Sequence, residues 1–227
     1  MSPKIIEYPS REALAEGLAA LIGNRLRTLV DQRGVARIAV PGGTTPGAML
    51  ERLGREPLDW EKVVVTLTDE RWVPSTEPRS NQKLLAETLF AGPAAAATFS
   101  PLYGGTAEPT ESLPAVAAGL EQTALPLDIA VLGMGADMHT ASLFPGSVGL
   151  KEALAENAPV VVAVRTGDQP EPRVTLAARV LRGAGERHIL ITGTAKREAL
   201  QQALATKDPL QAPIVAVLEG ATVHFAE

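Results

Sequence analysis

The chain of 227 residues contains no cysteine. This composition excludes disulfide bonds, a thiolate nucleophile and a sulfur-ligated zinc, and it fits a cytoplasmic protein. The sequence also lacks a run of the ~18 apolar residues that a membrane-spanning helix needs, and residues 1–7 lack the apolar centre of a secretory signal. We therefore expect an unprocessed cytoplasmic protein with no membrane partner.

Positive charge is scarce and dispersed. The chain has 21 Lys and Arg against 26 Asp and Glu, which gives a net charge of −5 at pH 7. Nucleic-acid binding depends on basic clusters that displace counterions from phosphates, so we expect no nucleic-acid partner, although a local basic pocket remains compatible with this charge.

Common catalytic patterns are missing too. The Gly-x-Ser-x-Gly pattern of serine hydrolases and the Gly-Lys pair of the Walker loop are absent. The three histidines are not spaced as metal ligands. We expect neither an acyl-enzyme nucleophile nor a metal or other cofactor.

The sequence does contain alternating helical and extended patterns. The hydrophobic content of 45% and the charged content of 21% are ordinary for a globular protein. Alternation of helices with buried strands predicts an α/β fold with a mainly parallel sheet in three αβα layers, and we expect one domain over residues 1–227. Strands are expected at 37–40, 63–68, 128–132, 160–164, 188–192 and 222–225; the principal helices are expected at 11–33, 46–53, 81–90, 113–123, 150–156 and 195–204.

The most informative stretch follows the apolar run 128–132. Two glycines, Gly133 and Gly135, allow a sharp turn at the end of this expected strand, where ligands collect in parallel α/β sheets. The loop then carries Asp137 and His139, which form a candidate general base and the carboxylate that orients it. Neither His188 nor His224 has such a setting, and we expect both to be structural.

A second loop joins a strand to a helix. Gly42, Gly43, Thr44 and Thr45 offer backbone N–H groups and a positive helix end to an anion, with Thr45 as the expected cap and Pro46 as the first helical residue. This pattern indicates a phosphate-binding loop, but it is also compatible with a plain strand–helix turn.

Charged residues occur at two further element ends. Asp69, Glu70 and Arg71 follow a β-branched run, and they form either part of the site or a solvated loop edge. Lys196 lies in the first turn of a helix with Thr194 as its expected cap. A cation there is unfavourable for the helix dipole unless an anion binds nearby, although a plain surface lysine remains the alternative.

Four segments together resemble the 6-phosphogluconolactonases. Residues 133–146, Gly-Met-Gly-Ala-Asp-Met-His-Thr-Ala-Ser-Leu-Phe-Pro-Gly, are similar to the family signature except that Met138 replaces a glycine. If that position requires a positive φ, the methionine is strained. The other three segments are similar to the family's phosphate loop, its Asp-Glu-Arg motif with a downstream Ser-Asn, and its Thr-Gly-x-x-Lys element; they are 42–45, 69–74 with 80–81, and 192–196.

The resemblance implies a fold like that of the isomerases and CoA transferases, and hydrolysis of 6-phosphoglucono-δ-lactone by water that His139 activates. It further implies catalytic roles for Asp137, Asp69 and Arg71. Binding of this phosphorylated sugar lactone is implied for Gly42, Gly43, Thr44, Thr45, Asn81 and Lys196 and for one or both of Arg165 and Arg173, between which spacing does not choose. We expect a monomer or a weak homodimer.

Two other functions deserve comparison. The related glucosamine-6-phosphate isomerases and deaminases carry a glutamate in a His-x-x-x-x-Glu spacing, but here that position is Phe144. A non-catalytic sugar-phosphate sensor is the second alternative, although no DNA-binding helix pair accompanies the expected domain.

Overall fold

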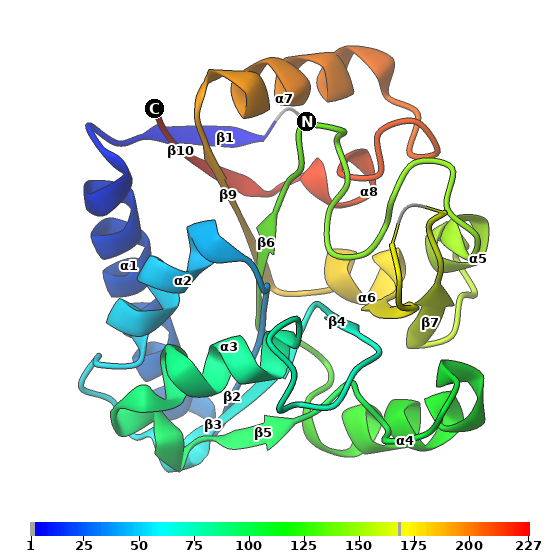
Figure 1. Cartoon of the computed structure of the whole chain (residues 1–227). Helices are drawn as coiled ribbons and strands as arrows, with labels where there is room; N and C mark the ends of the chain where they lie inside the picture. The colour runs from blue at the N-terminus through cyan, green and yellow to red at the C-terminus, as the bar shows by residue number, and fades with distance from the viewer. Residues whose placement is uncertain (1–2, 168) are drawn as a thin grey trace.

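The computed structural model describes residues 3–167 and 169–227, so Met1, Ser2 and Asp168 lie outside it. Among the described residues, seven parallel strands form the central sheet in the order β1-β10-β9-β6-β2-β3-β5 (Figure 1). The strands are β1 (Lys4–Glu7), β2 (Ala36–Val40), β3 (Val63–Leu67), β5 (Thr98–Ser100), β6 (Ile129–Gly133), β9 (Glu186–Thr192) and β10 (Thr222–Ala226). The two outermost strands, β1 and β5, are short and were not anticipated from sequence pattern.

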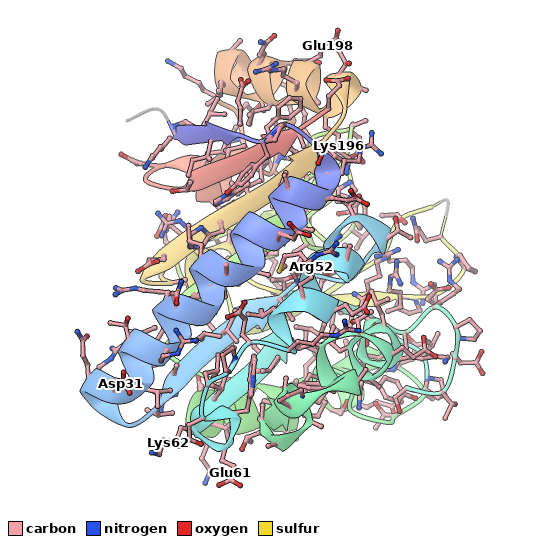
Figure 2. The ribbon with its side chains drawn as sticks, turned by 90° about the vertical axis from the view of Figure 1, so that its left-hand side faces the viewer. Asp31, Arg52, Glu61, Lys62, Lys196 and Glu198 are labelled. Carbon is pink, nitrogen blue, oxygen red and sulfur yellow. The ribbon has the colours of Figure 1, made fainter. Side chains whose placement is uncertain are left out.

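Helices cover the sheet on both sides. Figure 1 shows α1 and α2 on one side and α6 and α8 on the other, and Figure 2 shows α1 crossing in front of the strands. This arrangement confirms the expected α/β fold with a mainly parallel sheet. The helices are α1 (Arg11–Arg33), α2 (Thr44–Leu53), α3 (Asn81–Glu87), α4 (Leu113–Thr123), α5 (Leu150–Leu154), α6 (Ala178–Arg182), α7 (Thr194–Thr206) and α8 (Val215–Leu218).

Local signals explain where α1 starts and stops. Ser10 caps α1 by accepting a 3.1 Å hydrogen bond from the Ala13 N–H, and Gly34 ends the helix in the left-handed conformation at φ 75°. One side of α1 is apolar and faces the rest of the protein. Leu18, Ile22 and other apolar residues at helical spacing are buried on this side.

Two predicted helix starts were wrong by one or two residues. The caps are Gly43 for α2 and Gly193 for α7, so neither Thr45 nor Thr194 is a cap. Pro46 is consequently the third helical residue rather than the first. Proline is tolerated there because the first-turn N–H groups have no partner within the helix in any case.

A small antiparallel sheet stands beside the main one. It consists of β4 (Asp69–Arg71), β8 (Arg173–Leu176) and β7 (Val161–Val164), in that order. The sequence predicted a strand at 160–164 but not its place outside the main sheet. The pairing brings Arg71 opposite Arg173, which are far apart along the chain.

The order of the main strands reverses beside β2. From β2 the chain continues through β3 and β5 towards one edge of the sheet, and then through β6, β9 and β10 towards the other. Ligand sites of parallel α/β sheets lie outside the carboxyl ends of the strands at such a reversal. In the part of the chain that the structure describes, no helix is both long and apolar enough to cross a membrane.

Candidate active site

A cleft of about 240 Å³ lies where the reversal predicts a ligand site. Loops that follow four neighbouring strands, β9, β6, β2 and β3, supply most of its wall. The lining residues are Pro41, Gly42, Gly43, Thr44, Thr45, Pro46, Asp69, Arg71, Asn81, Gly133, Met134, Gly135, His139, Ala141, Arg173, Leu190 and Lys196. The cleft therefore brings together segments from across the chain.

The loop after β2 presents the start of α2 to this cleft. Its N-cap, Gly43, has φ 102° and makes no side-chain cap hydrogen bond. The first N–H groups of α2 are thus available to an anion, and the helix dipole adds a partial positive charge. Gly42 must lack a side chain, because a Cβ there would lie 1.9 Å from Oδ1 of Asn81.

Asn81 is held by two contacts. Its Nδ2 donates a 2.9 Å hydrogen bond to the carbonyl of Asp69, and its backbone N–H donates a 2.7 Å bond to Oε1 of Glu70. The sequence alone indicated no specific role for Glu70. Its carboxylate also accepts hydrogen bonds from the backbone N–H groups of Arg71 and Gln82 and from the Ser80 hydroxyl.

Burial raises the pKa of Glu70 in spite of these donors, which act in the opposite direction. The period-two alternation of a strand could have revealed the difference between the two carboxylates of β4. Asp69 and Arg71 line the cleft, whereas Glu70 points to the other side and fixes the start of α3.

Asp69 is 6% exposed and links the strand end to the loop of His139. Its Oδ1 accepts a 3.2 Å hydrogen bond from the Thr68 hydroxyl, and its Oδ2 accepts a 2.6 Å bond from the Ser142 hydroxyl. Nη1 of Arg173 lies 3.8 Å from the same Oδ2. Asp69 therefore has both oxygens engaged in a buried polar cluster.

Asp137 and His139 form the expected pair. Oδ1 of Asp137 lies 2.5 Å from Nδ1 of His139 and also accepts a 3.3 Å hydrogen bond from the His139 backbone N–H. A Cβ on Gly135 would lie 2.2 Å from that Nδ1, so only glycine lets the pair sit over this position. Within the described residues, Nε2 of His139 has no hydrogen-bond partner, and the ring lines the cleft.

Electrostatics favour the ionised form of Asp137. Partial burial acts to raise the pKa of this carboxyl, but the hydrogen bond and charge of His139 outweigh it and bring the pKa below its ordinary value. The carboxylate is therefore available to hold a proton on Nδ1 of His139, which leaves Nε2 as the basic nitrogen.

Met138 has φ 66°, so the position does require the left-handed conformation that glycine adopts readily. Backbone hydrogen bonds hold the turn nevertheless, and one of them runs from the Met138 N–H to the Gly135 carbonyl at 3.0 Å. The Gly135 N–H donates to the His139 carbonyl at 3.0 Å, and the Ile214 N–H donates to the Met138 carbonyl at 3.1 Å. The loop thus tolerates the methionine at the cost of local strain.

Lys196 lies in the first turn of α7 and lines the cleft (Figure 2). Burial and the charge of Arg11 lower the pKa of its ammonium group. Oε1 of Glu227 accepts hydrogen bonds from the N–H and hydroxyl of Thr194 at 3.2 and 2.5 Å. The N-terminal end of α7 therefore already interacts with the carboxylate of Glu227. The ammonium group of Lys196, in the same turn, lines the cleft.

The structure separates the two candidate arginines. Arg173 lines the cleft, and burial lowers the pKa of its guanidinium. Arg165 instead borders a different groove, its backbone pairs with Val148, and its side chain lies 3.7 Å from Glu108. The structure therefore places Arg173 in the lining of the cleft and Arg165 at another groove, and which of them contacts phosphate stays a prediction.

The remaining histidines lie in β9 and β10, away from the cleft. Nδ1 of His188 is 3.0 Å from Nε2 of His224, whose Nδ1 is 2.9 Å from the hydroxyl of Tyr8. Both histidines are buried. This hydrogen-bonded chain agrees with the structural role expected for them.

Together these features define an α/β protein in which the start of α2 and a histidine–aspartate pair line the same cleft. No cluster of three or more His, Cys, Asp or Glu with metal-binding geometry occurs among the residues 3–167 and 169–227. The imidazole of His139 and three cationic side chains, Arg71, Arg173 and Lys196, line this small cleft.

Comparison with known proteins is consistent with this class. The family model described as glucosamine-6-phosphate isomerases/6-phosphogluconolactonase matches residues 9–225. The chain is 46% identical over 219 residues to a 6-phosphogluconolactonase of Rhizobium meliloti, with coverage of 96% of this chain and 93% of the relative. It is 40% identical to that of Pseudomonas aeruginosa, with coverage of 93% and 90%. The chain belongs to the glucosamine-6-phosphate isomerase/6-phosphogluconolactonase family.

Solved structures agree. A crystal structure of a 6-phosphogluconolactonase from Shewanella baltica superposes with a TM-score of 0.95 at 32% identity and covers 99% of this chain and 98% of that one. A monomeric glucosamine-6-phosphate deaminase superposes with a TM-score of 0.78 at 20% identity, with coverage of 98% and 96%. The second likeness concerns the fold alone.

Proposed function

We infer that the protein hydrolyses 6-phosphoglucono-δ-lactone to 6-phosphogluconate in the oxidative pentose phosphate pathway. Relatives that share 40–46% of its residues over nearly the whole chain carry the name of this enzyme. The observation that carries the inference is the His139–Asp137 pair, which stands in the same cleft as the Gly42–Thr45 loop.

In the mechanism that we propose, Nε2 of His139 removes a proton from a water molecule while the water oxygen attacks the lactone carbonyl carbon. Asp137 holds the proton on Nδ1 and stabilises the imidazolium that forms. When the bond between the carbonyl carbon and the ring oxygen breaks, His139 returns the proton to that ring oxygen. Positioned proton transfer of this kind contributes about 10²–10⁴-fold to the rate.

The phosphate of the substrate would bind at the other side of the cleft. Gly43 and Thr44 supply the N–H groups at the start of α2, and Lys196 and Arg173 supply charge. Gly42 and Thr45 complete the loop. Arg71 either joins the phosphate or stabilises the negative charge on the lactone carbonyl oxygen. Binding of the distant phosphate orients the carbonyl towards the activated water.

Asp69 and Asn81 would act at the floor of the same cleft. Asp69 has both oxygens in hydrogen bonds, which supports a role in holding the His139 loop and Arg173 rather than in taking a proton. The side-chain amide of Asn81 lies so close to Gly42 that it restricts the conformation of the Gly42–Thr45 loop. We therefore propose that these two side chains shape the substrate-binding surface.

Position 144 favours lactone hydrolysis over sugar-phosphate isomerisation. An aldose–ketose isomerase needs an acid partner for ring opening, and in the resemblance described above that partner is a glutamate five residues after the histidine. Phe144 cannot supply a proton there.

The test compares the hydrolysis of 6-phosphogluconolactone with that of unphosphorylated gluconolactone. Proton release measures the rate of each reaction. We expect a strong preference for the phosphorylated lactone, and we expect His139→Ala to lower kcat by about 10²–10⁴-fold. Arg165→Ala is the control, because Arg165 lies outside the cleft. Full activity of His139→Ala would refute the base, equal rates on both lactones would refute the phosphate site, and conversion of glucosamine 6-phosphate would favour the isomerase alternative.

Residues 1–227 are proposed to act as one domain, in the cytoplasm, as a monomer or weak homodimer and without a metal, cofactor or nucleic-acid partner. Light scattering after size-exclusion chromatography measures the oligomeric state. Activity after dialysis against a chelator tests the metal, and a fluorescent duplex tests nucleic-acid binding.

A further inference from the structure

The ring of Phe144 lies against the imidazole of His139. Their centroids are 4.4 Å apart and their planes are inclined by 34°. Cζ of Arg173 lies 5.2 Å from the centroid of the same Phe144 ring. Phe144 is absent from the described lining of the cleft, but it touches two residues, His139 and Arg173, that belong to this lining.

The stack supplies a restraint that the hydrogen bond to Asp137 does not. One hydrogen bond at Nδ1 fixes the position of that nitrogen but lets the imidazole tilt about the bond. A ring packed on the face of His139 restricts this tilt. The two contacts together determine the direction of Nε2, and general-base catalysis depends on that direction.

The stack also has an electrostatic consequence. The face of a phenyl ring carries partial negative charge, so it attracts a cation placed over it. His139 becomes a cation when it takes a proton from water. The ring of Phe144 therefore stabilises the protonated imidazole more than the neutral one, from the face, while Asp137 does so from the edge.

Arg173 contacts the ring of Phe144 and is itself held in place by neighbouring side chains. Its Nη2 donates a 2.6 Å hydrogen bond to Oε1 of Gln169, and Asp69 lies nearby in the buried cluster described above. A guanidinium held in this way fixes Phe144 by a cation–π contact. The ring of Phe144 thus connects a substrate-facing cation with the base.

We propose that Phe144 is a positioning residue of the lactonase reaction: its ring sets the plane of the His139 imidazole and stabilises the protonated form that arises during catalysis. This inference rests on the proposed function. It also gives Phe144 a role in the lactonase reaction, in addition to the absence of the glutamate that the isomerases carry at this position.

The experiment compares wild type, Phe144→Leu and Phe144→Tyr in kcat, KM and the pH dependence of kcat/KM, together with an NMR titration of the His139 ring. Phe90→Leu is the matched control, because Phe90 is also half-buried and pairs with an aromatic ring, Phe99, at 5.6 Å outside the cleft. For Phe144→Leu we expect kcat to fall about tenfold with little change in KM. Its acid limb and NMR midpoint should move to lower pH by about half a unit.

Phe144→Tyr should restore kcat and the midpoint, and Phe90→Leu should change neither. Site-specific trifluorophenylalanine at position 144, which keeps the shape of the ring but weakens its negative face, should reproduce the midpoint shift even if Phe144→Leu does not fold. Loss of kcat without a midpoint shift, or wild-type behaviour of Phe144→Leu, overturns the role of Phe144 alone. An inactive wild type overturns the proposed function as well.

Discussion

The hydroxyl of Ser142 donates a 2.6 Å hydrogen bond to Oδ2 of Asp69, across 73 residues of sequence. Both side chains are buried. This contact joins the loop that carries His139 to the short strand that carries Arg71, so both side chains depend on the same hydrogen bond for their position. Loss of this hydrogen bond should therefore lower both the free energy of unfolding and kcat.

Ser142→Ala should lower the free energy of unfolding by about 2–3 kcal/mol, because a buried carboxylate loses a donor. It should also lower kcat, since the His139 loop loses its anchor. Ser100→Ala is the control. Ser100 is also buried, but its hydroxyl lies 3.0 Å from a neutral partner, Thr123, and its loss should cost about 1 kcal/mol. Urea denaturation measures the free energy of unfolding of both variants. An equal loss in the two variants would contradict a charge-assisted hydrogen bond between Ser142 and Asp69.

The two arginines that flank one loop should differ in substrate binding. Arg173→Met should raise KM about tenfold or more, because a buried cation at the cleft is lost. Arg165→Met should leave KM within about twofold, since Arg165 borders another groove. Steady-state kinetics with the phosphorylated lactone measure both variants. A larger effect at Arg165 would refute the assignment.

Spacing along the chain predicted one part of this site and not the other. Asp137 and His139 are two residues apart behind a buried strand, so their pairing could be expected from the sequence alone. Arg165 and Arg173 lie on either side of the same stretch, 166–172, so distance along the chain does not distinguish them. Only the strand pairing distinguishes them, because Arg173 lies opposite Arg71 in β8 while Arg165 pairs with Val148.

The same limit applies to the fold. The parallel sheet followed from the alternation of apolar runs and helices, whose periods differ along the chain. The separate sheet of β4, β8 and β7 did not, because its strands pair over long sequence distances. Glu70 was missed for a related reason: the alternation that separates it from Asp69 applies only once residues 69–71 are assigned to a strand, and that strand belongs to this separate sheet.

Met138 should tolerate glycine and reject a β-branched residue. Met138→Gly relieves a left-handed conformation that costs about 1–3 kcal/mol, and it loses some side-chain packing, so stability and kcat should both remain close to wild type. Met138→Val should cost about 1–2 kcal/mol more and lower kcat, because branching at Cβ is poorly compatible with a positive φ.

Lys207 offers the control for this comparison. It has φ 55° at the exposed end of α7, so Lys207→Val should destabilise the protein similarly and leave kcat unchanged. Thermal unfolding and initial rates distinguish the two sites. If Met138→Val keeps full activity, strain in the turn has no bearing on the position of His139.

His224 should make the protein sensitive to acid. Burial, His188 and Lys4 together lower its pKa to about 4 from an ordinary value of 6.5. The unfolded chain therefore binds a proton on His224 below about pH 6.5, whereas the folded protein does so only near pH 4. Stability contributed by the neutral imidazole is complete above pH 6.5 and falls by about 3 kcal/mol on acidification to pH 4.

Other groups titrate in the same range, so the prediction concerns a difference between two proteins. Burial lowers the pKa of His188 in the same direction, whereas the raised pKa of Glu70 acts oppositely, because its protonated form is favoured in the folded state. His224→Gln keeps an amide donor for His188 but cannot titrate. Urea unfolding of both proteins between about pH 7 and pH 4 should show wild type losing stability more steeply by about 3 kcal/mol. Parallel curves would mean that the buried imidazole carries a proton as readily in the folded protein as in the unfolded chain.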